Sequence, residues 1–290
     1  MFNKALILYK LSNYEIYFLN KNSSLFGKKN KDIDNITKRF AEAHTAHYKT
    51  LAFVEDVLSE HKIKYEKYPR GENTGYSEYD LVITVGGDGT FLEASRKINN
   101  QLLIGVNSDT KRSVGKLCTC SSKSFKSTLD NILKNNFTIK KLHRLQIEKN
   151  NNVIFSNCLN EILICHSNPA AMSRYYLDIN GVEEEQFSSG IWIATPCGST
   201  GAINSAGGKK VNKYDKSFQF LARELYDCKG KKYYFKSGIA NASSVISIRS
   251  LMRKGKIFID GNHFSCPITY GDVIKVYISP KPLDSIEING

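Results

Sequence analysis

A glycine-rich motif, GGDGT at residues 86–90, constrains the fold of this chain more than any other feature. It follows an apolar run at residues 80–85 and precedes an amphipathic stretch at residues 91–99. Three glycines in a strand-to-helix turn allow positive φ angles and let backbone N–H groups approach a phosphate, while the helix dipole adds positive potential there. We therefore expect a strand–turn–helix unit with an anion site at its turn.

Asp88 is the one residue of this motif whose charge does not suit a phosphate site. A carboxylate among phosphate-binding amides repels an anionic ligand unless it binds a proton, a metal ion or a hydroxyl group. Its presence indicates chemistry in addition to binding, although an aspartate that only caps the following helix would fit the same pattern. The string GGDGT also occurs in several kinases that phosphorylate small hydroxyl compounds, including lipid kinases. It therefore suggests phosphoryl transfer without naming the acceptor.

The first half of the chain alternates strand and helix patterns. Between Ile36 and Leu58, apolar residues recur at steps of three and four, which predicts a long helix after a polar loop that continues to about residue 34. Such alternation predicts a parallel sheet covered by helices, with ligands beyond the carboxyl ends of the strands, where Asp88 and Asn107 both lie. The runs that predict strands are residues 6–9, 63–68, 80–85 and 102–106.

The second half of the chain changes pattern. From about residue 139, short alternating runs are separated by turn signals such as Asn180-Gly181, which predicts an all-β domain, a sandwich. Within it we expect one helix at residues 217–226, because the apolar residues there share a helical face. A chain of 290 residues exceeds the about 100–200 residues of a typical domain. We place a Rossmann-like α/β domain at residues 1–137 and the β-sandwich at residues 138–272.

Composition and charge limit the classes of partner that this protein is expected to bind. The net charge of +13 comes from lysines scattered in pairs and not gathered in one tract, so we expect no nucleic-acid partner. A lysine-rich genome bias is the simpler explanation of the charge, and a phosphorylated small-molecule ligand is the alternative. No apolar run of about 18 residues predicts a membrane span, and the N-terminus lacks a signal-peptide pattern. The seven cysteines are expected to be reduced, and Cys118 and Cys120 lack a second pair at zinc spacing. We expect a cytoplasmic protein, or one of an organelle matrix if a targeting segment is missing.

Two polar segments interrupt the β pattern. Asn160-Glu161 lies within an apolar run, and such a glutamate must face solvent, a cation or ligand hydroxyls. Adjacent residues on a regular strand point to opposite faces, so both can reach one ligand only at a strand end or a bulge. A solvated sheet edge is the simpler alternative. The second segment, residues 195–208, has many glycines and small hydroxyl residues, which offer N–H and O–H groups to a polar ligand.

These motifs together resemble those of the NAD kinases. The resemblance is carried, in order, by GGDGT at residues 86–90, Asn160-Glu161, TPxGST at residues 195–200 with Gly207-Gly208, and the Asp-Gly-Asn triplet at residues 260–262. The stretch at residues 105–118 is longer than the common family version and resembles the mitochondrial-type branch, as does the triplet at residues 188–190. Four ordered motifs span nearly the whole chain.

The resemblance implies transfer of the γ-phosphoryl of ATP to the 2′-hydroxyl of the adenosine ribose of NAD, giving NADP, with NADH as a further acceptor. Asp88 would be the catalytic base. Mg²⁺ would bind with the ATP phosphates and not through an assigned protein ligand. The last residues, 273–290, would return to the first domain, and a homodimer or homotetramer is expected. The implied binding residues are Gly86, Gly87, Gly89 and Thr90 for the donor phosphates, and Asn107, Asn160, Glu161, Ser189, Thr195, Cys197, Thr200, Gly201, Ala202 and Ser205 for the dinucleotide.

The chain also departs from the family pattern. NAD kinases commonly have a tyrosine at the position of Ala202, a serine or threonine at that of Cys197, and an aspartate at that of Ser189. Loss of an aromatic face, of a hydroxyl and of a negative charge predicts a looser pocket that binds NAD weakly. Two alternatives stay open: a lipid or sphingoid-base kinase that shares GGDGT, and a non-catalytic dinucleotide sensor.

Overall fold

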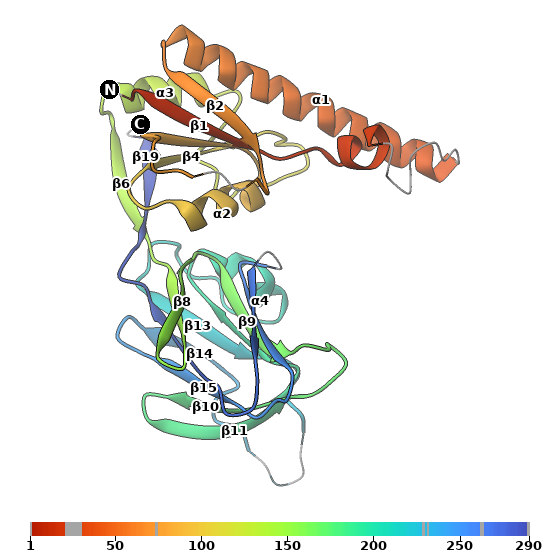
Figure 1. Cartoon of the computed structure of the whole chain (residues 1–290), viewed down its shortest axis with the longest axis vertical. Helices are drawn as coiled ribbons and strands as arrows, with labels where there is room; N and C mark the ends of the chain where they lie inside the picture. Colours follow the sequence, from red (N-terminus) through yellow and green to blue (C-terminus); the bar gives the residue numbers. More distant parts are fainter. Residues whose placement is uncertain are drawn as a thin grey trace. The chain divides into compact units, whose positions relative to one another are not determined.

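The computed structural model describes residues 2–20, 31–72, 75–227, 230, 232–261 and 264–288, without the side chains of residues 31–34. The chain divides into two compact units (Figure 1). Met1–Lys140 and Asp284–Gly290 form the first, which we call the α/β unit, and Lys141–Leu283 forms the second, the β unit.

The α/β unit is built on a five-stranded parallel sheet in the order β2-β1-β3-β4-β5. The three central strands are almost entirely buried, which is why they appear in the sequence as continuous apolar runs. The predicted parallel sheet is confirmed. The strands are β1 (Lys4–Tyr9), β2 (Lys64–Pro69), β3 (Leu81–Gly86), β4 (Leu102–Asn107) and β5 (Cys120–Ser121).

Helices cover this sheet. The predicted long helix is α1 (Lys31–Glu60), whose apolar face packs with α3 (Phe125–Leu133) against one side of the strands. Helix α2 (Asp88–Lys97) contacts β3 and β4, and in Figure 1 it lies on the other side of the strands from α1. Helix α3 was not predicted from the sequence, and neither was the π-helical turn at Glu15–Leu19, where we expected a polar loop.

The β unit is a sandwich of two six-stranded antiparallel sheets, and this prediction is confirmed. One buried apolar cluster takes residues from both sheets. The predicted turn at Asn180-Gly181 has positive φ at both residues, as a tight hairpin requires. One sheet contains β11 (Val182–Ser188), β10 (Ser173–Ile179), β15 (Ile246–Ser250), β18 (Val273–Ile278), β7 (Leu145–Lys149) and β8 (Asn152–Cys158); the other contains β14 (Ser237–Asn241), β13 (Ser217–Ala222), β12 (Ile191–Ala194), β9 (Glu161–His166), β16 (Gly255–Ile259) and β17 (Phe264–Ile268).

The helix predicted at residues 217–226 is wrong, because its first six residues form β13, which pairs with β12 and β14. Phe218 and Phe220 face the sandwich core, while Leu221 packs on the other face with Ile203. A strand buried on both faces has no polar alternation, so its apolar residues also satisfied a helical spacing.

The predicted boundaries of the returning segment also differ from the structure. Residues 273–278 form β18 within the sandwich, where Ile274 and Val276 alternate into the core. The return is made instead by β19 (Leu283–Ile288), which pairs with β6 (Phe137–Leu142). The alternation of residues 273–278 was itself a signal for the sandwich.

Candidate functional site

The glycine turn joins β3 to α2 as predicted. Gly86 ends β3, and a Cβ atom there would lie 2.3 Å from Oγ1 of the buried Thr90, so a side chain does not fit. Gly87 precedes the helix, and its carbonyl accepts the N–H groups of Thr90 and Phe91 at 3.0 and 3.3 Å. The backbone can therefore come close to a ligand at the start of a ten-residue helix.

Asp88 is the first residue of α2, and its carboxylate turns toward another segment. Oδ1 accepts the N–H of Leu117 at 2.8 Å, and Oδ2 accepts that of Lys116 at 3.1 Å. The residue that caps α2 is Gly87, and both Asp88 oxygens accept amides of another segment, so the interpretation of Asp88 as a mere helix cap is wrong. A carboxylate has about four acceptor positions, so a half-exposed Asp88 with two amide donors can still accept a ligand hydroxyl.

The segment after β4 is organised by Asn107. Its Nδ2 donates to the carbonyl of Ser113 at 2.9 Å, and its Oδ1 accepts the N–H of Asp109 at 3.2 Å. Gly115 has φ of +62°, and a Cβ there would lie 2.4 Å from Asn107 Nδ2. Asn107, which we predicted to contact the dinucleotide, thus holds together the loop whose amides bind Asp88.

His47 supports the same loop from α1, a role that sequence analysis missed. Its ring is fully buried, and Nδ1 lies 2.9 Å from Oγ of Ser108. Burial lowers the pKa of His47 to about 4, with neighbouring Lys10 acting in the same direction, so the ring is neutral at pH 7. Helical spacing alone could not identify a partner 61 residues away.

In the β unit, Glu161 is the first residue of β9, and Asn160 lies just before it. Glu161 is 8% exposed, so the solvated-edge alternative is wrong. Neither Oε2 of Glu161 nor Oδ1 of Asn160 finds a hydrogen-bond partner within the part of the chain that the structure describes. Burial, followed by the charge of nearby Asp260, raises the pKa of Glu161 to about 7.

Asp260 fixes the backbone around this pair. Its carboxylate accepts the N–H groups of Asn160 and Leu159 at 2.7 and 3.2 Å, and the thiol of Cys158 at 3.4 Å. The N–H of Asp260 in turn donates to the carbonyl of Glu161 at 2.9 Å. Asp260 has the positive φ of a tight turn, which Gly261 continues, whereas Asn262 of the same predicted motif lies outside the described residues.

The TPxGST segment packs against Asn160 and Glu161. The Thr195 N–H donates to the Asn160 carbonyl at 2.9 Å, and Thr195 Oγ1 accepts the N–H of Gly198 at 3.1 Å. A Cβ on Gly198 would lie 2.1 Å from the Asn160 carbonyl oxygen, and one on Gly201 would lie 2.9 Å from Glu161 Oε2. The two glycines allow this close approach, while the buried Thr195 holds the backbone.

The remaining predicted residues differ in position. Cys197 is buried, which raises the pKa of its thiol to about 12, and Thr200 is half-buried. Ala202 and Ser205 are exposed on the short helix α4 (Ala202–Ser205). Ser189 precedes β12 at the end away from Thr195, and its N–H donates to the Arg223 carbonyl at 2.9 Å. Ser189 therefore does not join the Asn160–Glu161 cluster.

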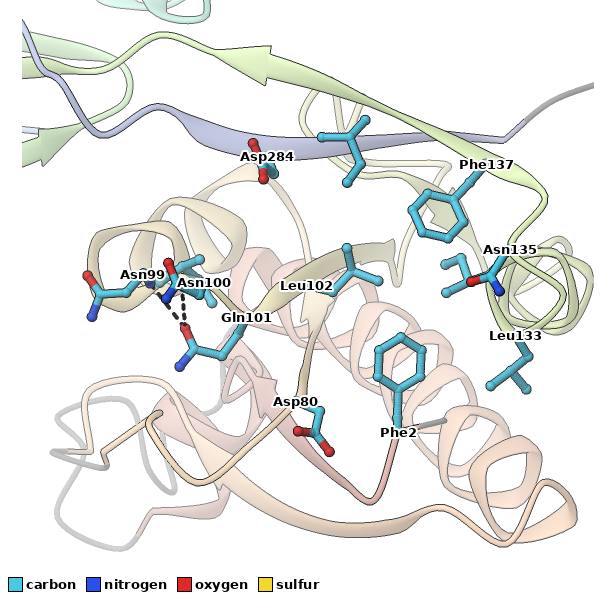
Figure 2. A pocket seen from close by; sticks show the side chains of 13 residues that line it. Phe2, Asp80, Asn99, Asn100, Gln101, Leu102, Leu133, Asn135, Phe137 and Asp284 are labelled. Atoms are coloured by element: carbon cyan, nitrogen blue, oxygen red, sulfur yellow. Dashed lines mark hydrogen bonds between the residues drawn. The ribbon is translucent and has the colours of Figure 1, made fainter.

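A cavity of about 390 Å³ also exists in the α/β unit, but it lies at the opposite end of the sheet. Figure 2 shows Phe2, Leu102 and Phe137 around it, with Asp80 and Gln101 at its polar edge. Asp80 and Gln101 precede β3 and β4, whereas the glycine turn and Asn107 lie at the carboxyl ends of those strands. The cavity is thus separate from the predicted site.

No metal-ligand cluster is found among the described residues: no group of three or more histidine, cysteine, aspartate or glutamate side chains there is placed to hold a metal ion. No described helix is both long and apolar enough to cross a membrane.

The fold and these two clusters define a class of protein: an α/β unit with a phosphate-type glycine turn, joined to a β-sandwich in which buried acceptors of Asn160 and Glu161 have no partner within the described residues. The family model for the ATP-NAD kinase N-terminal domain matches residues 14–137. An NADH kinase of Arabidopsis thaliana is 30% identical over 254 residues, which cover 79% of this chain and 80% of that protein. A probable NADH kinase of Oryza sativa subsp. japonica is 29% identical over 253 residues, covering 79% and 78%.

A solved structure supports the same fold. The crystal structure of an NAD kinase from Archaeoglobus fulgidus in complex with ATP matches with a TM-score of 0.68 at 20% identity, covering 99% of this chain and 94% of that one. An NAD kinase of Borrelia garinii subsp. bavariensis is 30% identical over 221 residues, covering 74% and 77%. The chain belongs to the NAD kinase family.

Proposed function

We propose that this protein transfers the γ-phosphoryl of ATP to the 2′-hydroxyl of the adenosine ribose of NAD, giving NADP. The observation that carries the proposal is the pair of buried acceptors, Glu161 Oε2 and Asn160 Oδ1, beside the glycines of TPxGST. Buried acceptors without partners are costly unless a ligand supplies donors. Ribose hydroxyls and an adenine amino group are such donors.

Asp88 performs the chemical step in this proposal. It accepts the proton of the 2′-hydroxyl as that oxygen attacks the γ-phosphorus, and the bond from the γ-phosphorus to the β–γ bridging oxygen breaks to release ADP. General base catalysis of this kind contributes about 10²–10⁴-fold to the rate. The amides of Lys116 and Leu117 fix the direction of the carboxylate, so little motion is needed to meet the hydroxyl.

Gly86, Gly87, Gly89 and Thr90 bind the donor phosphates through the turn and the start of α2. Mg²⁺ suits this arrangement because it is often held by phosphates and water with only one or two carboxylates. When bound, the ion neutralises the negative charge that develops on the phosphates.

The setting of the reaction is also part of the proposal. We place the protein in the cytoplasm, or in an organelle matrix if a targeting segment precedes the chain, and as a homodimer or homotetramer. The loop at residues 105–118 supports a place near the mitochondrial-type branch. NADH is a further acceptor, which the names of the two plant relatives favour.

The test is direct. Purified protein is incubated with Mg²⁺-ATP and either NAD or NADH, and the product is measured with an NADP-specific dehydrogenase. Parallel reactions contain diacylglycerol or a sphingoid base. We expect NADP or NADPH and no lipid phosphate. A lipid product, or a dinucleotide that binds without being phosphorylated, would favour the lipid kinase or the sensor and overturn the proposal.

A further inference from the structure

A second cavity of the α/β unit lies at the carboxyl end of β1. Its volume is about 210 Å³, and its walls come from the turn after β1, from α1 and from the loop after β4. This is below the about 300–1,000 Å³ of pockets that enclose whole small-molecule ligands. Its polar side chains include three cations, Lys10, Arg39 and Arg112.

This cavity adjoins the glycine turn. Ser113 lines the cavity, and its Oγ lies only 2.8 Å from where a Cβ on Gly87 would be. The N–H of Lys10 donates to the carbonyl of Val85 at 3.3 Å, so Lys10 lies beside the strand that enters the turn. A ligand on the turn therefore has a cationic cavity next to it.

Cationic side chains outnumber carboxylates in this cavity. Its one carboxylate, Asp109, is paired with Arg112 at 3.1 Å, and Arg112 also binds Glu42 at 2.7 Å. The Lys10 ammonium makes no hydrogen bond or ion pair with any residue that the structure describes. Burial lowers the pKa of Lys10; the charge of Asp109 opposes this shift, and the charge of Arg70 adds to it by a smaller amount.

Arg70 places a fourth cation on the other side of the turn. It follows β2, and its Nη1 lies 3.3 Å from where a Cβ on Gly89 would be. Its Nε binds Glu93 at 3.0 Å, which fixes the guanidinium against α2. The carboxylate of Asp109 is already paired with Arg112, so a phosphate group would supply the half-buried Lys10 ammonium with a further anion.

We propose that Lys10 is a donor-binding residue, and that the cavity lined by Lys10, Arg39 and Arg112 holds the phosphate groups of the donor that are not transferred. The inference rests on the proposed kinase function and assigns the part of the site that binds the non-transferred phosphates of the donor. The cavity takes phosphates and not the whole nucleotide, because it is small and continues from the turn that holds the transferred group.

The experiment compares two lysines of the same strand. Lys10→Met removes the ammonium at the carboxyl end of β1 and keeps the stem, whereas Lys4→Met does the same at the amino end, where Lys4 binds Glu66 and Glu78. For Lys10→Met we expect the KM for ATP to rise about tenfold or more, because charged hydrogen bonds to phosphate are strong, while the KM for NAD stays within about twofold. Lys4→Met should leave both KM values unchanged, and Lys10→Arg should restore most of the ATP affinity.

Binding of inorganic tripolyphosphate, measured by calorimetry without NAD, separates this inference from the proposed function. We expect wild type and Lys10→Arg to bind it and Lys10→Met to bind it at least about tenfold more weakly, with binding that weakens as salt rises. If wild type makes no NADP, the kinase proposal fails, and the calorimetry still tests the cavity. An unchanged KM for ATP in an active Lys10→Met protein, or equal tripolyphosphate binding by wild type and Lys10→Met, overturns the inference.

Discussion

Asp88 and Glu161 are both carboxylates at the end of an interior strand of a sheet, but their surroundings are opposite. Asp88 is half-exposed and accepts two backbone N–H groups from the loop after β4. Glu161 is buried beside Asp260, and its Oε2 has no partner within the described residues. The Asp88 carboxylate is already oriented before a ligand arrives, whereas Glu161 Oε2 receives a hydrogen bond when a ligand donates one. The first arrangement suits a reacting group, and the second suits a binding group.

The largest expected effect concerns Asp88→Asn. The amide keeps the shape and loses the basicity, so we expect kcat to fall about a hundredfold or more while NAD affinity stays within a few-fold. The control is Asp80→Asn at the other end of β3, where Oδ2 accepts the N–H groups of Asn3 and Lys4. Both variants should lose about 1 kcal/mol of stability, and only Asp88→Asn should lose turnover. Equal losses of binding, stability and turnover would assign Asp88 a structural role.

Glu161→Gln makes the same chemical change with the opposite expected effect on stability. A folded-state pKa raised to about 7 means that the contribution of Glu161 to stability is fully present below pH 4.5 and is lost as the pH rises through about 7, because the unfolded chain releases the proton first. At pH 8 the variant should therefore be more stable than wild type, by up to about 3 kcal/mol, and should bind NAD about tenfold more weakly.

Trp192, the single tryptophan of the chain, reports unfolding of the β unit by fluorescence in urea. Glu183→Gln is the matched control, because the Glu183 side chain forms an exposed ion pair with Arg249 at 2.8 Å and no other pair within the described residues. A loss of stability in Glu161→Gln at pH 8, or no difference between pH 5 and pH 8, would mean that Glu161 has a partner and is not an open acceptor.

In each unit the sequence was sufficient to predict some elements and not others. The alternation of apolar runs and the order of motifs were sufficient for the parallel sheet, the sandwich and the position of the glycine turn. Helix α3 was missed although Phe125, Leu129 and Ile132 show its spacing, because a segment of nine residues between polar stretches gives a weak periodic signal. β13 was mistaken for a helix because both of its faces are buried.

The supporting contacts of the site could not be predicted. The amides that hold Asp88 come from residues 28 and 29 positions away, and the His47–Ser108 contact spans 61 positions. No spacing rule encodes such pairs. Asn107 was identified as polar and well placed, but only its two hydrogen bonds within the loop show that it holds this loop.

The smallest effect is expected at Ala202, which stands where NAD kinases commonly have a tyrosine. This residue is exposed, so a tyrosine there has room to present a ring. We expect Ala202→Tyr to tighten NAD binding several-fold, since an aromatic contact is worth about 0.5–1.5 kcal/mol. Calorimetry on both proteins measures it. Unchanged or weaker binding would indicate that another side chain already fills the space.

The most direct test of the account is a titration of Glu161 by carbon NMR of labelled glutamate carboxyl groups, with Glu161→Gln identifying the signal. In the free protein we expect a pKa of about 7, since the carboxyl is buried near the charge of Asp260 and its Oε2 has no hydrogen-bond donor among the described residues. Saturating NAD, without ATP, should lower it to the ordinary glutamate value of about 4.3 or below, because ligand hydroxyls favour the charged form. An ordinary pKa in the free protein, or one that NAD leaves unchanged, would contradict the claim that Glu161 is an acceptor completed by the dinucleotide.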